Sequence, residues 1–196
     1  MDHRLLQRVS FWAFLFSIDR DLAATTCQAA CSCGGRLHRA DYPRKLRGGP
    51  KGLPREYMYR LSFCCSRDGC RKRATPPSVR FLGRKVYLHA VVILVAAMRQ
   101  GPTPRRVREL AQLFDVDRRT IERWQAFWRE ALPQTSFWKV ARGQLALLVE
   151  LADLPRALLT GFFRKEVPDP LECWKRLLVF LSPITIPGGL KSEVLQ

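Results

Sequence analysis

The clearest pattern of apolar and polar positions runs from Pro104 to Trp128 and has the spacing of two short helices. With a turn at Asp115, Ile121 and Trp124 on the second helix face back toward the first. Asp117 suits the N-cap position, because its carboxylate can accept hydrogen bonds from free N–H groups of the first turn. The pattern predicts a helix-turn-helix whose apolar seam is Leu110, Ala111, Phe114, Val116, Ile121 and Trp124.

The second helix of this pair has a polar outer face formed by Arg118, Arg119, Glu122 and Arg123. The turn position that glycine usually takes is Asp115, a residue type that tolerates a positive φ at modest cost. A plain helical hairpin with a solvated arginine face is the competing interpretation. The pattern of apolar positions alone does not separate the two.

Apolar periodicity predicts further helices on both sides of this pair. Residues 2–24 are expected to form an amphipathic helix that packs in the core, and a membrane-surface or partner-docking helix is the alternative. Residues 86–99 supply a third helix, which residues 101–104 connect to the pair as a hinge. Pro133 is expected to end the second helix of the pair, and residues 134–196 to form three apolar helices.

Six of the seven cysteines fall in two groups: Cys27, Cys31 and Cys33, then Cys64, Cys65 and Cys70. Each group adjoins a glycine, and two such thiol groups in a reducing compartment indicate a tetrahedral zinc site instead of disulfides. Alternating apolar positions at Tyr57, Tyr59, Leu61 and Phe63, and a segment around Tyr42, predict short strands between the groups. Together these features predict a zinc ribbon.

The spacings C-x3-C-x-C and C-C-x4-C leave the ligand set open, and we favour Cys31, Cys33, Cys65 and Cys70. Gly34, Gly35 and Gly69 would let the backbone turn under the metal, and Cys64 would point away from Cys65 across the strand. Cys27 is the first substitute, and His38 is a weaker one. A set of buried free thiols is the alternative for the whole cluster, and Cys173 is expected in the core.

Charge changes this picture more than any other property of the composition. The chain has a net charge of +17 and an isoelectric point near 10.4, as expected of a protein that binds polyanions. Between residues 36 and 85, fifteen Lys and Arg stand against three Asp and Glu, a net charge of +12. Residues 134–196 carry a net charge of only +2.

We find no apolar run long enough to span a bilayer and no signal-peptide pattern, so a cytoplasmic, nucleoid-associated protein is expected.

The segment after the second cysteine group is a candidate basic strip that tracks a phosphate backbone. Its residues are Arg71, Lys72, Arg73, Arg80, Arg84 and Lys85. Arg118, Arg119, Thr120, Glu122 and Arg123 are the candidates for reading bases. An ordinary charged loop is the alternative for the strip.

The expected fold is mainly α with a small β zinc ribbon, divided into four parts. Residues 1–24 form the N-terminal helix, 25–83 the zinc ribbon with the basic strip, 84–133 the helix-turn-helix domain and 134–196 a helical packing or assembly module. The last part is expected to mediate a homodimer or binding to another protein, because its apolar content exceeds what three short helices can bury among themselves. The alternative is a monomer in which residues 2–24 cover this apolar surface.

The motifs CSCGG, FCCSRDGCRKR and LAQLFDVDRRTIERW, within residues 27–133, are similar to the N-terminal half of bacterial insertion-sequence transposases and their small regulatory proteins. In that family, this half binds terminal inverted repeats, and a separate nuclease domain with an acidic triad catalyses strand transfer. The resemblance implies DNA binding without catalysis, because nothing after Pro133 resembles the nuclease domain. Residues 134–196 have no resemblance that we can name.

The sequence therefore favours a non-enzymatic, sequence-specific double-stranded DNA-binding protein, a repressor or accessory factor of a mobile element, with zinc as its cofactor. A small-molecule substrate and a membrane are not expected as partners. Two alternatives are open: a DNA-binding subunit of a transposase or nuclease that another chain completes, and an RNA-binding zinc ribbon protein. A recognition helix favours the wide major groove of B-form DNA over the deep, narrow groove of RNA.

Overall fold

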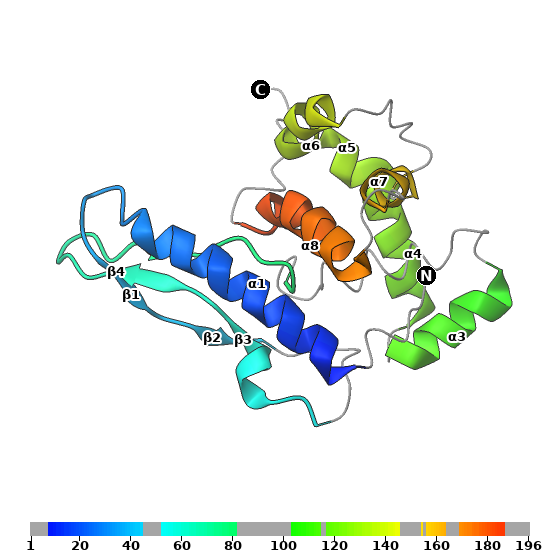
Figure 1. Ribbon diagram of the computed structural model, residues 1–196, viewed down its shortest axis with the longest axis horizontal. Coiled ribbons are helices and arrows are strands. Elements are labelled where there is room, and N and C mark those ends of the chain that lie inside the picture. The colour runs from blue at the N-terminus through cyan, green and yellow to red at the C-terminus, as the bar shows by residue number, and fades with distance from the viewer. Residues whose placement is uncertain are drawn as a thin grey trace.

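The computed structural model describes residues 8–44, 52–81, 103–114, 117–145, 154, 156–163 and 169–186. Most of the described elements are helices, and two small antiparallel sheets complete the described part of the fold (Figure 1). The expectation of a mainly helical chain with a small β part is confirmed at this level. The predicted helix at residues 86–99, and Arg84, Lys85, Asp115 and Val116, lie outside the described residues.

The first element is α1 (Val9–Gln28), which extends beyond the predicted end of the N-terminal helix. Its last turns hold Thr25 and Thr26, whose hydroxyls donate to the carbonyl oxygens of Asp21 and Leu22. These bonds to the residue four positions back let threonine remain within a helix. The buried face of α1 contains Phe11, Trp12, Leu15, Ile18 and Ala23.

Within the described residues, five short strands follow α1 and form two antiparallel sheets. Strand β4 (Phe63–Cys65) lies between β1 (Leu37–Arg39) and β5 (Arg73–Ala74), and β2 (Tyr42–Pro43) pairs with β3 (Tyr59–Arg60). The register sets His38 opposite Cys64 and Leu37 opposite Cys65. Tyr57, which we predicted to be in a strand, lies in a 3-10 helix (Arg55–Met58) instead, because its N–H donates to the carbonyl of Pro54 and closes a turn.

The predicted helix pair is present as α3 (Pro104–Phe114) and α4 (Arg118–Ala126), which contact one another. Val107 and Leu110 of α3 and Ile121 and Trp124 of α4 are buried. Asp117 is the N-cap of α4, and its carboxylate accepts a 2.8 Å hydrogen bond from the backbone N–H of Thr120. The N-cap and the apolar contact of this pair are as predicted.

Pro133 does not end the helix where the sequence analysis places the end. Helix α4 continues through a π-helical segment (Phe127–Ala131) into α5 (Leu132–Gln134), and the chain turns only at Thr135, which caps α6 (Ser136–Ala141). Proline has no N–H, and its ring crowds the carbonyl of the residue four positions back. The wider π-helical turn before Pro133 relieves this crowding, so the chain stays helical.

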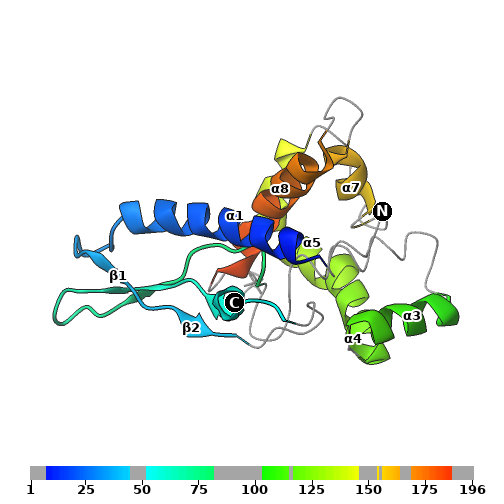
Figure 2. The same ribbon diagram turned by 60° about the horizontal axis from the view of Figure 1, so that its bottom comes forward.

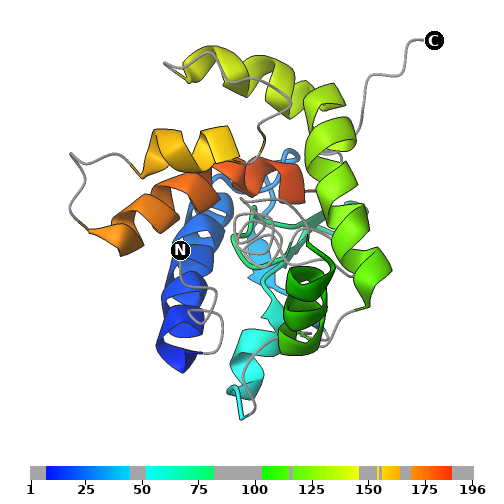
Figure 3. The same ribbon diagram turned by 90° about the vertical axis from the view of Figure 1, so that its right-hand side faces the viewer.

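The described elements that follow are a 3-10 turn (Arg142–Gln144), α7 (Arg156–Phe162), α8 (Pro170–Leu181) and a further 3-10 turn (Ser182–Thr185). Helix α8 packs against both α7 and α1. Figure 3 shows α7 and α8 beside α1, and α4 on the opposite side of the view. Among the described residues, no helix has both the length and the apolar character needed to cross a membrane.

A single apolar core joins α1, α3, α4, α7 and α8. Its largest fully buried side chains are tryptophans, including Trp128, Trp138 and Trp174. In the described part of the chain, the exposed large apolar side chains are Val9, Val140, Leu171 and Ile186. Much of the apolar surface that suggested an assembly module is thus used inside the molecule, and self-association through residues 134–196 stays a prediction.

Candidate metal centre and candidate nucleic-acid interface

Four thiols meet at one end of the three-stranded sheet. Cys31 and Cys33 lie in the loop after α1, Cys65 ends β4, and Cys70 lies in the turn before β5. Their sulfurs all lie within 4.8 Å of one another. These are the four residues that the sequence analysis favours, and their arrangement could hold a metal ion.

The spacing of the sulfurs fits tetrahedral coordination. Four ligands about 2.3 Å from a central zinc ion would lie about 3.8 Å from one another. The Sγ atoms of Cys31 and Cys70 are 3.8 Å apart, and those of Cys33 and Cys65 are 3.5 Å apart. A disulfide requires about 2.05 Å, and all seven cysteines are free.

The first cysteine turn depends on two glycines. The N–H of Gly34 donates to the carbonyl of Cys31 at 2.7 Å, and the N–H of Cys31 donates to the carbonyl of Gly35 at 3.1 Å. Gly34 has a φ of +78°, a conformation that favours glycine. A Cβ on Gly35 would lie 2.6 Å from the Sγ of Cys65. The backbone therefore approaches the thiol cluster more closely than any side chain would allow.

The second cysteine turn repeats this construction. The backbone N–H of Arg67 donates to the Sγ of Cys65 at 3.4 Å, and Gly69 has a φ of +81°. The guanidinium of Arg67 also reaches across to the carbonyl of Cys33 at 2.7 Å. N–H groups aimed at sulfur stabilise thiolates and orient them, as the outer shell of a metal site does.

The thiols of Cys33 and Cys65 differ in acidity. The hydrogen bond from the backbone of Gly35, followed by those from Cys70 and Cys65, lowers the pKa of Cys33 to about 6. At Cys65 the N–H of Arg67 lowers the pKa, but burial and hydrogen bonds with the other three thiols raise the pKa to about 12. Cys33 is therefore the thiol of this pair that loses its proton more readily, and a bound metal ion would require all four thiols to be deprotonated.

The other candidate ligands lie outside the cluster. Cys27 is exposed in the last turn of α1, 3.8 Å from the carbonyl of Leu37. Cys64 and His38 are paired across β4 and β1, and the Sγ of Cys64 contacts the carbonyl of Arg71 at 3.4 Å. Cys173 is buried in α8, as expected of a core residue.

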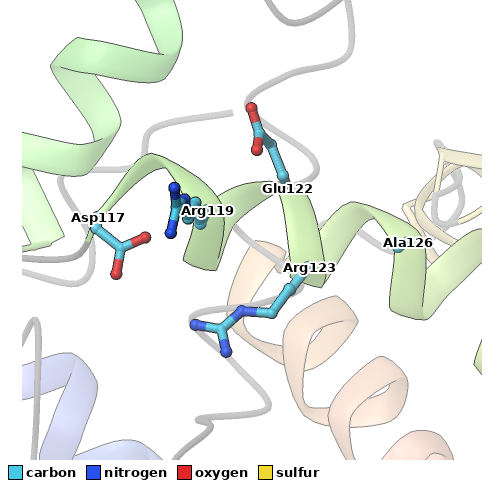
Figure 4. A pocket seen from close by; sticks show the side chains of 5 residues that line it. All are labelled: Asp117, Arg119, Glu122, Arg123 and Ala126. Atoms are coloured by element: carbon cyan, nitrogen blue, oxygen red, sulfur yellow. The ribbon is translucent and has the colours of Figure 1, made fainter.

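Helix α4 carries the candidate base-reading residues on an exposed surface. The guanidinium of Arg118 pairs with Glu122 at 2.7 Å, and that of Arg123 donates to the Thr120 hydroxyl at 2.9 Å. An open hollow of about 640 Å³ lies along this helix, lined by Asp117, Arg119, Glu122, Arg123 and Ala126. Figure 4 shows these side chains spread along α4, with Glu122 and Arg123 pointing in opposite directions from the helix.

Only part of the predicted basic strip is free to contact a ligand. Lys72 is exposed, and Arg71 pairs with the carboxylate of Asp68 on the surface. Arg73 is exposed but donates to the carbonyl of Ala40 and the hydroxyl of Ser62, and its guanidinium also lies over the ring of Tyr42. These three residues lie on or beside β5, next to the thiol cluster.

The prediction that Arg80 belongs to the strip is wrong, because its side chain is fully buried. Its guanidinium pairs with Asp19 of α1 at 2.8 Å and donates to the carbonyls of Tyr57 and Tyr59. Asp19 also accepts from the hydroxyl of Ser78 and the N–H of Val79. A buried charge is tolerated when it is paired and fully hydrogen-bonded.

Arg60 is a second buried arginine in the same region. It donates to the carbonyl of Pro76 at 2.6 Å and to that of Thr185 at 3.5 Å. Burial lowers the pKa of this guanidinium, and the charge of Asp19 opposes the shift. The sequence alone does not indicate that Arg60 and Arg80 lie near Asp19, because Asp19 is about forty residues away from Arg60 and even farther from Arg80 along the chain.

Comparison with known proteins returns no relative: no family model, no curated protein and no solved structure matches the chain.

Proposed function

We propose that this chain is a sequence-specific double-stranded DNA-binding protein, a repressor or accessory factor of a mobile element, without a catalytic domain of its own. The observation that carries the proposal is the capped helix α4, which has a buried seam against α3 and a row of exposed polar side chains. This is the form of a recognition helix that enters a major groove. Arg119 and Arg123 are its best base-reading residues, because arginine can make two hydrogen bonds to guanine.

The same proposal assigns zinc to the thiol cluster. Four thiolates in a tetrahedral arrangement suit zinc, which in structural sites takes sulfur ligands in this geometry. The strands of the sheet are only two or three residues long, so they contribute little stability by themselves. Zinc would hold the two cysteine turns together and thereby fix the basic residues around them.

The association with a mobile element rests on the resemblance of residues 27–133 to the N-terminal half of insertion-sequence transposases. The basic character of the chain supports nucleic acid as the partner in either case. RNA binding is the competing use of the basic surface, and α4 favours duplex DNA because side chains cannot read the narrow major groove of RNA. A nuclease completed by another chain is the competing enzyme.

Selection of bound sequences from a random duplex pool tests the proposal. The zinc-loaded full-length protein should enrich one motif, and structured RNA should compete poorly with the selected duplex. Recovery of random sequence only, or stronger competition by RNA, would refute the assignment. Cleavage of the selected duplex in the presence of Mg²⁺ would support the enzyme alternative.

A further inference from the structure

Two surfaces suited to DNA lie toward opposite ends of the molecule. Helices α3 and α4 lie beyond the N-terminal end of α1, whereas the β1–β4–β5 sheet lies alongside the C-terminal half of α1, with its cysteine turns near the C-terminal end of that helix (Figures 1 and 2). Helix α1 has 20 residues, so at 1.5 Å per residue it is about 30 Å long. One turn of B-form DNA is about 34 Å long.

The thiol end of the molecule is strongly basic. Arg36, Arg67, Arg71, Lys72 and Arg73, which we call the basic end, are all exposed there. Asp68 is the exposed carboxylate in this region, and it is paired with Arg71. The side chains of Arg36 and Lys72 make no hydrogen bond or ion pair within the described part of the chain. They are therefore free to contact phosphates.

A buried polar network joins the middle of α1 to β3 and to the segment that follows β5. Asp19 of α1 binds the segment from Ser78 to Arg80, and Arg80 binds the backbone that leads into β3. Ser78 donates its N–H to the hydroxyl of Thr185, which follows α8. The same α1 shares the apolar core with α3 and α4. The two surfaces are thus held at one spacing instead of being joined by a flexible linker.

We propose that one chain contacts a single duplex at two places. Helix α4 reads bases in one major groove, and the basic end contacts phosphates about one helical turn away. This inference rests on the proposed function. It adds the length of DNA that one chain covers and the order of the two contacts along the duplex. The phosphate contacts contribute affinity and salt dependence but no sequence preference.

The test uses the duplex selected above in two lengths, one with about 15 bp of flanking DNA on each side and one with about 3 bp, less than a third of a turn. The variant Arg36→Ala/Lys72→Ala removes two charges from the basic end. The matched variant Lys139→Ala/Arg142→Ala removes two exposed charges from α6 and the turn after it, which lie away from both surfaces in Figure 1. Metal content and circular dichroism check that each variant folds.

On the long duplex, hydroxyl-radical cleavage should show two protected regions centred about 10 bp apart. Arg36→Ala/Lys72→Ala should abolish the region away from the motif and reduce the slope of log affinity against log salt by about 2, at roughly 0.9 per phosphate contact. The same variant should change little on the short duplex, and the matched variant little on either.

A single protected region, or an equal loss of slope on both duplexes, would overturn the two-contact inference while the proposed function stands. Failure to select any motif would refute the proposed function, and the two-contact inference would fail with it.

Discussion

At Gly35 the backbone passes so close to the thiol cluster that a methyl group would meet two of the four sulfurs, 2.6 Å from the Sγ of Cys65 and 3.3 Å from that of Cys33. Gly35→Ala should therefore weaken zinc binding, by about 10- to 100-fold as for other changes beside metal ligands. Competition with a chromophoric chelator measures this affinity. Gly143→Ala is the control, because a Cβ there meets nothing within 4 Å. Equal zinc affinity in both variants would contradict the assignment of a zinc site to these four thiols.

The stability that the carboxylate of Asp117 gives to the N-terminus of α4 depends on pH. The hydrogen bond from the backbone N–H of Thr120 lowers the pKa of this carboxyl below its ordinary value. A lowered folded pKa gives stability that is present above the unfolded value, about 3.9, and is lost as pH falls through the folded value.

Asn caps helices as well as Asp but does not titrate. The stability advantage of wild type over Asp117→Asn should therefore shrink as pH falls from 6 to 3, measured by denaturant unfolding at each pH. A difference that does not vary with pH would show that the charge of Asp117 is not involved.

The helices with strong apolar periodicity could be predicted from the sequence. Features that depend on residues far away along the chain could not. Asp117 and the seam of α3 and α4 follow from local sequence, and so does the choice among the cysteines, because glycines mark the turns. The burial of Arg80 could not be predicted, since its partner Asp19 lies on another element. The end of the helix at Pro133 was not predicted correctly, because nothing in the local sequence indicates the π-helical turn that precedes this proline.

The buried pair of Asp19 and Arg80 predicts a specific stability pattern. Arg80→Met leaves the Asp19 carboxylate buried without its cation and should destabilise the fold by about 3–5 kcal/mol. The double variant Asp19→Leu/Arg80→Met removes both charges and should recover part of that loss. Guanidinium unfolding of the wild type and the variants measures both effects. A cost of about 1 kcal/mol or less for Arg80→Met, as at an exposed pair, would contradict the burial of Arg80.

The sequence predicts a dimer formed through residues 134–196. Trp138 and Trp174 lie in the same core as Phe11 of α1, so the test requires the whole chain instead of a truncation. Leu171 of α8 is 42% exposed, and Leu171→Asp should shift a dimer toward monomer. Sedimentation at micromolar concentration measures the mass. A wild-type monomer, with and without the selected duplex, would contradict the prediction.

If α4 reads the base sequence, the ratio of affinities for the selected and a scrambled duplex depends on its exposed arginines. Arg119→Ala and Arg123→Ala each remove one exposed guanidinium from α4, and the loss of a bidentate base contact costs about 1–3 kcal/mol. Each variant should therefore lower the ratio by roughly 5- to 150-fold, mainly through weaker binding of the selected duplex. Arg142→Ala should leave the ratio unchanged. If Arg119→Ala and Arg123→Ala instead weaken both duplexes equally, α4 contacts phosphates only and does not read bases.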